Sequence, residues 1–459
     1  MKITKTVEKI FAVTIVSLCA IIYIYLYTSI FFIKHLYIGS EINGIKVSGK
    51  TVEEAKAVMT AELQSYSLNI KEREGKKEQI SSKDIGLKYK SEDEFTKFKK
   101  EQNPLKWGLS FFSTKNSKIT VDVLYDKEKL NRQIDKLTCI TGNIIEPQNP
   151  SFKYKGNTFV IIAGAKGNKI NKDILMQRAA DAISKREKTI DLEAADCYVK
   201  AQYNSKSQRV VEAKDILNKY VSSKITYTFG DNKVVLDGST INQWLTIDEN
   251  YKVALDEGKV KAYVESLANT YNTVGKTRSF HTSSGNNVNI DGGDYGWQIN
   301  VDKELQDLCE IIKGGQTVNK EPAYSQTTAF RGTNDIGNCY VEIDISRQHL
   351  WFYKNGSLVV EGSVVTGNLS LNHGTPAGVY KLKYKERDAT LKGPGYSVPV
   401  SFWMPFNEGI GLHDATWRWD FGGDIYKTNG SHGCVNLPYN LAQTIFNNVD
   451  DGTPVVCYY

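Results

Sequence analysis

Residues 429–438 read NGSHGCVNLP, and this run decides which fold and which chemistry the sequence predicts. It places a thiol, Cys434, directly after His432 and Gly433, while a further imidazole, His413, lies upstream in GIGLHDATW. A free cysteine has a pKa of roughly 8.5, so it needs a neighbouring base to act as a nucleophile at neutral pH. Gly433 permits a tight turn in which backbone N–H groups can converge on the oxyanion of a tetrahedral intermediate. Together these residues indicate acyl transfer.

Two other interpretations of the same residues stay open at this point. A lone cysteine is often a small buried apolar residue, and a lone histidine is often a structural hydrogen-bonding group. His413, His432 and Cys434 could also bind zinc and leave one coordination position open. Residue types and spacing favour the nucleophile without excluding either alternative.

The residues around this run have the pattern of a mostly β domain. Residues 340–345 alternate apolar and acidic side chains, as expected for a strand with one face in the core. Asn355-Gly356 stands between two strand-like runs and predicts a tight hairpin. Only residues 439–448 have a clearly helical pattern. We therefore expect a β domain at residues 337–459, preceded by a polar linker at residues 325–338.

An internal repeat precedes this domain and predicts two similar modules. Seven residues recur at a constant offset, so that Gly156, Ile161, Gly164, Gly167, Ile170, Asn171 and Asp173 correspond to Gly285, Ile290, Gly293, Gly296, Ile299, Asn300 and Asp302. Each unit has the pattern of a helix, a strand, a glycine-rich turn, a strand and a second helix. The glycines do not follow a strand and open a helix, so a phosphate-binding loop is not expected. We expect two α+β modules at residues 36–200 and 205–325.

The N-terminal segment predicts a membrane anchor. Residues 10–33 carry no charge and are numerous enough to cross a hydrocarbon core of about 30 Å as a helix. A short apolar core followed by a small-residue cleavage site is not found, which favours an uncleaved anchor over a signal peptide. Lys2, Lys5 and Lys9 precede the span and favour a cytoplasmic tail at residues 1–9. A buried core helix is the alternative interpretation.

Composition and cysteine usage narrow the function classes. The net charge is +6, and no basic stripe with interleaved aromatic residues is present, so nucleic-acid binding is not expected. The seven cysteines include no C-x-x-C pair, which argues against a zinc ribbon or a redox motif. Their spacing does not settle the disulfide state.

The motif resembles a known family. A histidine, seventeen intervening residues and then Ser-His-Gly-Cys-Val-Asn at residues 431–436 are similar to the signature of the L,D-transpeptidase catalytic domain. Residues 375–378 and 452–455 also fit that domain, and the repeats resemble, more loosely, the peptidoglycan-binding modules that precede it in membrane-anchored members. The resemblance implies a multidomain chain with a single transmembrane helix, two α+β modules and a C-terminal, mostly β, sandwich-like catalytic domain.

The resemblance also implies a reaction. Cys434 would attack the carbonyl of the third residue of a tetrapeptide stem, release D-Ala and hold the acyl group as a thioester. An amine of another stem would then accept it, giving a 3–3 cross-link in cell wall biogenesis and the maintenance of cell shape. With water as acceptor, the same acyl-enzyme gives an L,D-carboxypeptidase or peptidoglycan hydrolase, and a non-catalytic wall-binding protein is the third alternative. Expected partners are donor and acceptor stem peptides and membrane lipid, with inhibition by carbapenems and with no cofactor, metal or nucleic acid.

Residue roles follow from the same resemblance. His413 would be the general base, and the backbone carbonyl of Asp414 would orient its ring. The N–H groups of His432, Gly433 and Cys434 would form the oxyanion hole, with the His432 side chain near the thiolate. The further expected site residues are Ser431, Asn436 and Tyr396. The catalytic domain would lie outside the cell membrane and face the wall.

Overall fold

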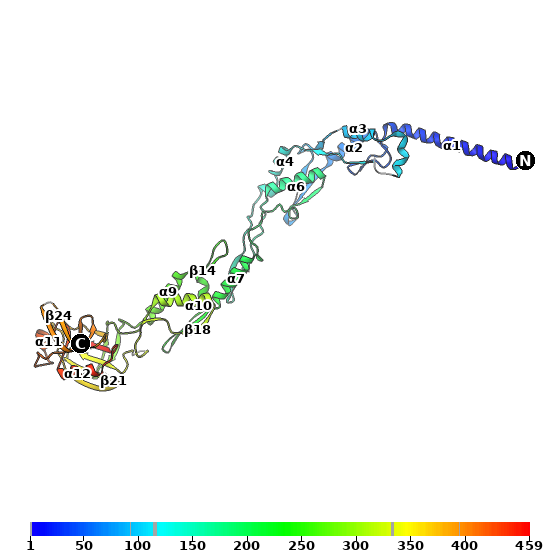
Figure 1. Ribbon diagram of the computed structural model, residues 1–459. Helices are drawn as coiled ribbons and strands as arrows, with labels where there is room; N and C mark the ends of the chain where they lie inside the picture. Colours follow the sequence, from blue (N-terminus) through cyan, green and yellow to red (C-terminus); the bar gives the residue numbers. More distant parts are fainter. Residues whose placement is uncertain (1, 92, 113–116, 332–334, 394) are drawn as a thin grey trace. The chain divides into compact units, whose positions relative to one another are not determined.

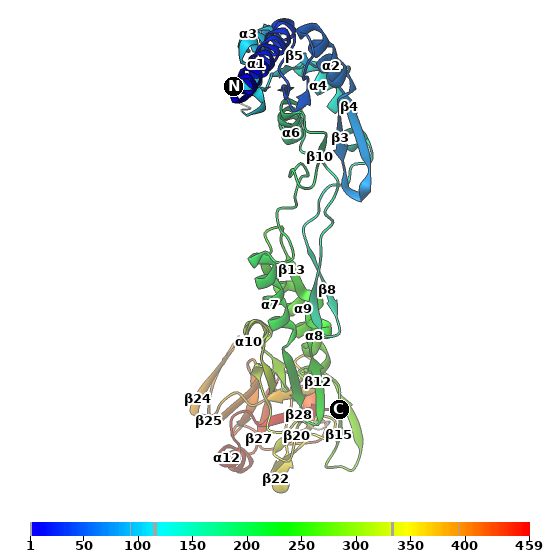
Figure 2. The ribbon, with the colours of Figure 1, turned by 90° about the vertical axis from the view of Figure 1, so that its right-hand side faces the viewer.

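The structure is a computed structural model that describes residues 2–91, 93–112, 117–331, 335–393 and 395–459. The chain divides into two compact units, which Figures 1 and 2 show from two sides. The first unit comprises Met1–Ser151 and Ile162–Ser205, and the second comprises Phe152–Ile161 and Lys206–Tyr459.

The first unit begins with the apolar helix α1 (Lys2–Lys34). Within it, Thr4–Lys34 spans 31 residues and contains an 18-residue window with a mean hydropathy of 2.3, so it is long and apolar enough to cross a membrane. The next helix, α2 (Val52–Ser65), starts with a capping box, because Thr51 Oγ1 accepts the Glu54 N–H and the Glu54 carboxylate accepts the Thr51 N–H.

Two small three-stranded sheets, the strand pair β5-β7 and several helices make up the rest of this unit. One sheet has the order β2-β1-β6 and the other the order β10-β3-β4. Leu68 and Ile70 of β3 pack against Leu175, Ala179 and Ile183 of α6, whose four-residue spacing places them on one helix face. The strands are β1 (Glu41–Ile42), β2 (Ile45–Lys46), β3 (Ser67–Lys71), β4 (Lys77–Ser81), β5 (Lys88–Tyr89), β6 (Lys118–Ile119), β7 (Val123–Leu124) and β10 (Thr189–Asp191). The helices are η1 (Arg73–Gly75), α3 (Asp93–Lys100), η2 (Pro104–Phe111), α4 (Lys127–Ile134), α5 (Thr138–Thr141) and α6 (Lys172–Lys185).

The second unit opens with a module that repeats this plan. Its sheet has the order β12-β11-β18, with β11 antiparallel to β12 and parallel to β18, as β3 is to β4 and β10. Helices α6 and α10 both begin at an asparagine cap, Asn171 or Asn300, whose side chain accepts a backbone N–H three residues on. The elements are α7 (Gln208–Val221), β11 (Lys224–Phe229), β12 (Asn232–Leu236), α8 (Gly238–Ile241), η3 (Asn242–Trp244), β13 (Leu245–Ile247), β14 (Val253–Leu255), α9 (Glu257–Tyr271), β17 (Gln298–Ile299), α10 (Val301–Gly314), β18 (Thr317–Lys320) and β19 (Tyr324–Gln326).

Two hairpins pack outside the modules to which the repeat pattern assigned them. The hairpin of β8 (Ser151–Lys155) and β9 (Thr158–Ile162) falls in the range expected for the first module, yet Phe159 is buried in the core of the second. The matching hairpin of β15 (Arg278–His281) and β16 (Asn287–Ile290) contributes Phe280 and Ile290 to a cluster with strands of the C-terminal domain. The expected limits at 36–200 and 205–325 therefore do not coincide with the packed modules, because each hairpin packs on the module or domain that follows its own.

The C-terminal domain is a two-sheet β structure, as predicted. One sheet has the order β22-β21-β20-β28-β23 and the other the order β24-β25-β26-β27. Its core joins Val341 and Phe352 of the first sheet, Phe402 and Leu412 of the second, and Ile445 of α12. The strands are β20 (Tyr340–Asp344), β21 (His349–Lys354), β22 (Ser357–Ser363), β23 (Gly378–Lys381), β24 (Glu386–Gly393), β25 (Tyr396–Asn407), β26 (Ile410–Asp414), β27 (Val435–Leu437) and β28 (Pro454–Tyr458), and the helices are α11 (Ile425–Asn429) and α12 (Tyr439–Asn448).

Two local predictions in this region have different outcomes. The Asn355-Gly356 hairpin is confirmed, because both residues have positive φ, 54° and 78°, as a type I′ turn requires. The polar stretch at residues 325–338 is more than a linker. Asp335 and Arg278, with side chains 4% and 7% exposed, form an ion pair at 2.7 Å, so this end of the stretch is fixed.

Candidate active site

Two parallel strands bring the predicted base and an amide side chain together. Strands β26 and β27 pair so that His413 lies opposite Asn436, 23 residues later in the chain. The Asn436 amide Nδ2 lies 3.0 Å from His413 Nε2. Cys434 directly precedes β27, so the same pairing brings the thiol to this edge of the sheet.

His413 is held in one tautomer. Its ring is buried, and its Nδ1 lies 2.8 Å from the backbone carbonyl oxygen of Asp414. A carbonyl only accepts, so Nδ1 carries the proton and Nε2 keeps its lone pair, which accepts from Asn436. Burial lowers the pKa of His413, and its contacts with Asp414 only partly oppose this. The imidazole is therefore neutral at neutral pH, in the form that a general base requires.

Arg418 extends this arrangement, and sequence reasoning did not predict it. Its Nε donates to Asn436 Oδ1 at 2.8 Å, and its Nη1 donates to the backbone carbonyl of Asn429 at 2.9 Å. Because the Asn436 oxygen is engaged by Arg418, the amide nitrogen faces His413. The only sequence signal was a cation five residues after His413, which spacing alone does not distinguish from a surface residue.

The Cys434 thiol lies against the turn between β25 and β26. Its Sγ donates to the Gly409 carbonyl oxygen at 3.6 Å and accepts from the Gly411 N–H. Burial raises the pKa of the Cys434 thiol to about 11, although the Gly411 N–H opposes the shift. Among the hydrogen bonds of the described residues, none joins this thiol to the His413 ring. The resting pair is thus a neutral thiol and a neutral imidazole, each engaged with another group.

The turn before Cys434 is closed by its own hydrogen bonds. Gly433 has φ of 117°, a conformation that favours glycine, and its N–H donates to Ser431 Oγ at 3.1 Å. Thr375 Oγ1 donates to the Gly433 carbonyl at 2.6 Å and accepts the Gly367 N–H at 3.0 Å. The Gly433 N–H is therefore used within the turn, in contrast to its expected place in the oxyanion hole. The sequence places Thr375 in a segment that fits the family and predicts no role for it.

The remaining predicted residues lie at the rim or outside the described part. The His432 side chain is exposed, and its ring centroid lies 5.1 Å from that of His373. Tyr396 begins β25, where it pairs with Gly393, but its side chain lies outside the described part of the chain.

One cavity of about 220 Å³ collects most of the predicted side chains. Hydrophobic walls come from the β24 and β25 hairpin, which Figure 2 shows as a long projection of this domain, and from Trp417 after β26. The lining residues are Leu391, Val398, His413, Trp417, Arg418, Gly430, Ser431, His432, Cys434 and Asn436. A thiol, a neutral imidazole and an apolar wall around one space suit attack on a peptide carbonyl.

Two family models match parts of this chain. A model described as "L,D-transpeptidase catalytic domain" matches residues 339–457. A second model, described as "Putative peptidoglycan binding domain", matches residues 78–191 and 203–320, together half of the chain. The chain belongs to the L,D-transpeptidase family. The predicted order of two peptidoglycan-binding modules and a C-terminal catalytic domain is confirmed.

Solved structures of other L,D-transpeptidases are similar to this chain. A cysteine-to-serine mutant of the Enterococcus faecium L,D-transpeptidase is 35% identical, with 54% of this chain and 100% of that chain covered and a TM-score of 0.46. The catalytic domain of the E. faecium enzyme acylated by ertapenem is 43% identical, with 26% and 97% covered and a TM-score of 0.25. Among proteins with curated descriptions, none matches.

The geometry gives no support to the zinc alternative in this L,D-transpeptidase. Among the described residues, one cluster of three possible metal ligands has all its ligand atoms within 4.8 Å of one another. It consists of Glu72, Glu78 and Cys139, in the first unit, and includes none of the residues of the zinc alternative. Both ring nitrogens of His413 are engaged by protein groups. All seven cysteines are free thiols.

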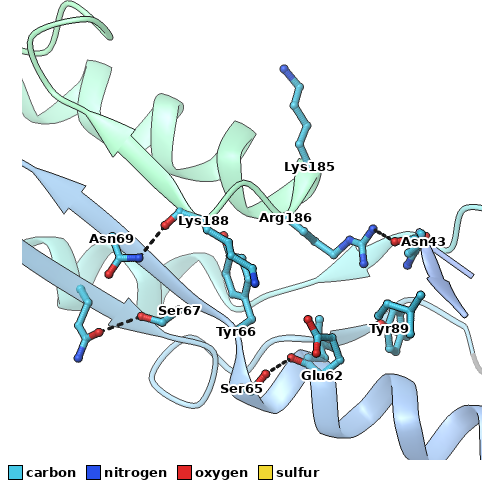
Figure 3. A pocket seen from close by; sticks show the side chains of 14 residues that line it. Asn43, Glu62, Ser65, Tyr66, Ser67, Asn69, Tyr89, Lys185, Arg186 and Lys188 are labelled. Carbon is cyan, nitrogen blue, oxygen red and sulfur yellow. Dashed lines mark hydrogen bonds between the residues drawn. The ribbon is translucent and has the colours of Figure 1, made fainter.

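A larger cavity, of about 490 Å³, lies in the first unit of the transpeptidase (Figure 3). Figure 3 shows Lys185, Arg186 and Lys188 on one side, with the Arg186 guanidinium directed at the Asn43 carbonyl, to which it donates at 2.9 Å. Its other lining residues are Gly44, Ile45, Glu62, Leu63, Ser65, Tyr66, Ser67, Asn69, Gln79 and Tyr89. The lining of this larger cavity holds no thiol and no imidazole.

Proposed function

We propose that this transpeptidase is a cysteine acyltransferase with Cys434 as nucleophile and His413 as general base. The observation that carries the proposal is the tautomer of His413, which leaves Nε2 unprotonated on a ring that lines the same cavity as the thiol. The thiol and imidazole are neutral at rest, so the proton moves during attack rather than beforehand.

The acylation step follows from these positions. The Cys434 proton passes to His413 Nε2 as Sγ attacks the carbonyl carbon of the third stem residue. The C–N bond to D-Ala then breaks, the proton passes to the departing amine, and a thioester remains. The N–H groups of His432 and Cys434 are the donors left for the oxyanion, because the Gly433 N–H is engaged by Ser431. Before attack, Sγ must leave Gly409 and Nε2 must leave Asn436.

Transfer to a second stem completes the reaction. The side-chain amine of an acceptor stem attacks the thioester while His413 accepts its proton, and Cys434 is released as the thiol. The product is a 3–3 cross-link. Attack by water instead yields a trimmed tripeptide, the product of an L,D-carboxypeptidase, so product mass separates the two acceptors. A carbapenem would acylate Cys434 as a mimic of the donor carbonyl.

We further propose that α1 anchors the enzyme in the cell membrane as a single span. Its length and its apolar surface support a membrane span. The lysines before Ile10 support a cytoplasmic N-terminus. The two modules and the catalytic domain then lie outside, where peptidoglycan is found. Membrane lipid and wall peptidoglycan are the partners that this arrangement requires.

The decisive experiment incubates the purified full-length protein with disaccharide-tetrapeptides and measures products by mass spectrometry. We expect 3–3 dimers from the unmodified enzyme and none from Cys434→Ala. Cys339→Ser is the matched control, because Cys339 is a partly exposed thiol hydrogen-bonded to Asn355, outside the cavity. Dimers formed at full rate by Cys434→Ala would falsify the nucleophile assignment.

A further inference from the structure

The first unit carries an apolar surface segment that the transpeptidase activity does not explain. The segment comprises the 3-10 helix η2 and the residue after it, residues 104–112. Four large apolar side chains are exposed on it: Leu105 (58%), Leu109 (59%), Phe111 (58%) and Phe112 (89%). A cluster of this kind on a folded unit indicates an interaction surface.

This segment is fixed against the C-terminal end of α1. The Trp107 ring stacks on Tyr25 at a centroid distance of 5.3 Å and on Phe32 at 5.5 Å. The Tyr25 hydroxyl donates to the Leu105 carbonyl oxygen at 2.7 Å. Figure 1 shows the segment, in cyan, beside the end of α1. The segment thereby lies against the part of α1 that exposes Leu26, Ile30 and Ile33.

The length of α1 sets the depth of the segment in a membrane. A span that enters the hydrocarbon core at Ile10 needs about 20 residues to cross it, so it leaves near residue 30. Tyr25 and Phe32 lie on either side of that level. Tyr23, Tyr25 and Tyr27 are the residue type enriched where a helix meets the headgroups. The contacts of Trp107 with Tyr25 and Phe32 therefore place the segment at the outer interface.

Charge next to the segment fits the same partner. Lys106 within it is exposed, as are Lys97 and Lys100 on the preceding helix α3. A lysine near an anionic lipid surface is attracted to it electrostatically. Apolar side chains flanked by lysines are typical of an element that lies in the interface rather than across the bilayer.

We infer that residues 104–112 form a membrane-surface element that inserts Leu105, Leu109, Phe111 and Phe112 into the outer leaflet beside α1. The inference rests on the proposed membrane anchor, since α1 supplies the depth. Lipid is the occupant to which the inference commits, because the patch lies against the exposed apolar part of α1. The element holds the first module at the lipid surface by a second attachment, independent of the span.

The test places an environment-sensitive fluorescent amino acid at position 109 of the full-length protein in vesicles containing anionic lipid. A lipid-borne spin-label quencher near the headgroups should quench it at least twofold more than the same probe at position 358. Leu358 is the matched control, because it is 46% exposed and lies in the catalytic domain. A probe at position 21, within α1, reports separately whether the span is in the bilayer.

The outcomes are distinguishable. The inference is supported if the probe is quenched at positions 21 and 109 of the otherwise unsubstituted chain. In the double variant Phe111→Glu/Phe112→Glu, quenching should then be lost at position 109 and kept at position 21. Quenching at 21 without quenching at 109 overturns it and leaves the anchor standing. A probe at 109 that is shielded from water yet not quenched by lipid also overturns it and indicates a second copy of the chain as occupant. The absence of quenching at 21 refutes the anchor itself and, with it, the inference.

Discussion

The two cavities of this enzyme differ in both volume and lining, and the larger one is not the one that holds the thiol and the imidazole. The cavity of the first unit, about 490 Å³, is more than twice the size of the cavity of about 220 Å³ at Cys434. Yet the larger one is lined by amides, hydroxyls, three cations and a single carboxylate. The smaller one holds a thiol and an imidazole whose pKa values are both shifted by burial toward the neutral form. A thiol in the same cavity as a neutral imidazole, rather than a larger volume, distinguishes the proposed reactive site.

The cause of the difference lies in the elements around each cavity. Trp403 and Trp417 lie 6.0 Å and 5.9 Å from the His413 ring, measured between centroids, and shield it from water. In the first unit, by contrast, burial raises the pKa of Tyr66 to about 12, and the Tyr66 hydroxyl donates a hydrogen bond to the Glu187 carbonyl oxygen. The one lining hydroxyl whose pKa is raised that far is therefore engaged by the backbone.

The largest expected effect separates the two cavities by activity. Cys434→Ala should lower the rate of 3–3 cross-linking by about 10⁴-fold or more, as removal of a catalytic nucleophile does. Arg186→Ala, in the larger cavity, should leave this rate unchanged. Both rates are measured by mass spectrometry of the dimeric product. A comparable loss in both variants would contradict the assignment of chemistry to the smaller cavity.

A smaller loss is expected when the support of His413 is removed. Asn436→Ala or Arg418→Ala should lower kcat by about 10²-fold with little change in KM, because a misplaced base costs roughly that much. Arg418→Ala should also raise the pKa of His413, since the nearby guanidinium charge lowers it. The acid limb of the pH–rate profile would then move to higher pH. A purely structural role for Arg418 would leave the position of that limb unchanged.

The pH dependence tests whether the pair is neutral at rest. Because the pKa of His413 is lowered from 6.5, the base stays neutral below that pH, and acylation should persist into mildly acidic solution. Because the pKa of Cys434 is raised to about 11, alkylation by iodoacetamide should rise steadily from pH 7 toward that value. Mass spectrometry of the alkylated Cys434 peptide gives the rate. A plateau reached by pH 7 would instead indicate a preformed thiolate.

The same shifts predict the direction of stability changes. Between pH 9 and about 11 the unfolded thiol loses its proton while the folded one keeps it, so stability falls as pH rises through this window. Below pH 6.5, His413 gains a proton in the unfolded chain but stays neutral in the folded protein, where burial lowers its pKa. Stability therefore falls as pH drops. Hydrogen exchange of β26 and β27 should show both losses.

Features set by neighbouring residues were predictable from the sequence. The capping box at Thr51, the Asn355-Gly356 hairpin and the helix at Tyr439–Asn448 each depend on a few adjacent residues. The residue types of the motif indicated acyl transfer, and the family resemblance singled out His413 as the base. Local rules therefore predict single turns and helices, and the motif predicts the nucleophile and the base of the catalytic domain.

Features that depend on distant pairing were not predictable. Two hairpins pack outside their own repeat, because Phe159 and Phe280 are buried in the cores of other modules. The periodicity of the sequence does not indicate which core buries each side chain. Arg418 acts through Asn436, and the thiol is held by the carbonyl of Gly409, 25 residues earlier. The use of the Gly433 N–H inside its own turn is likewise visible only in three dimensions.

The smallest expected effect concerns Arg186, in the larger cavity. Arg186 has φ of 56°, a left-handed conformation that costs a non-glycine residue roughly 1–2 kcal/mol, and Gly315 occupies the matching helix end in the second module. Arg186→Gly removes this strain but also loses the bond to the Asn43 carbonyl, so local stability should change by only about 1 kcal/mol. Gly315→Ala should destabilise by more, since a Cβ there would lie 2.8 Å from the Lys219 carbonyl oxygen. Hydrogen exchange of α6 and α10 measures both changes. If Arg186→Gly opens α6 as strongly as Gly315→Ala opens α10, Arg186 braces the first module far more strongly than one hydrogen bond explains.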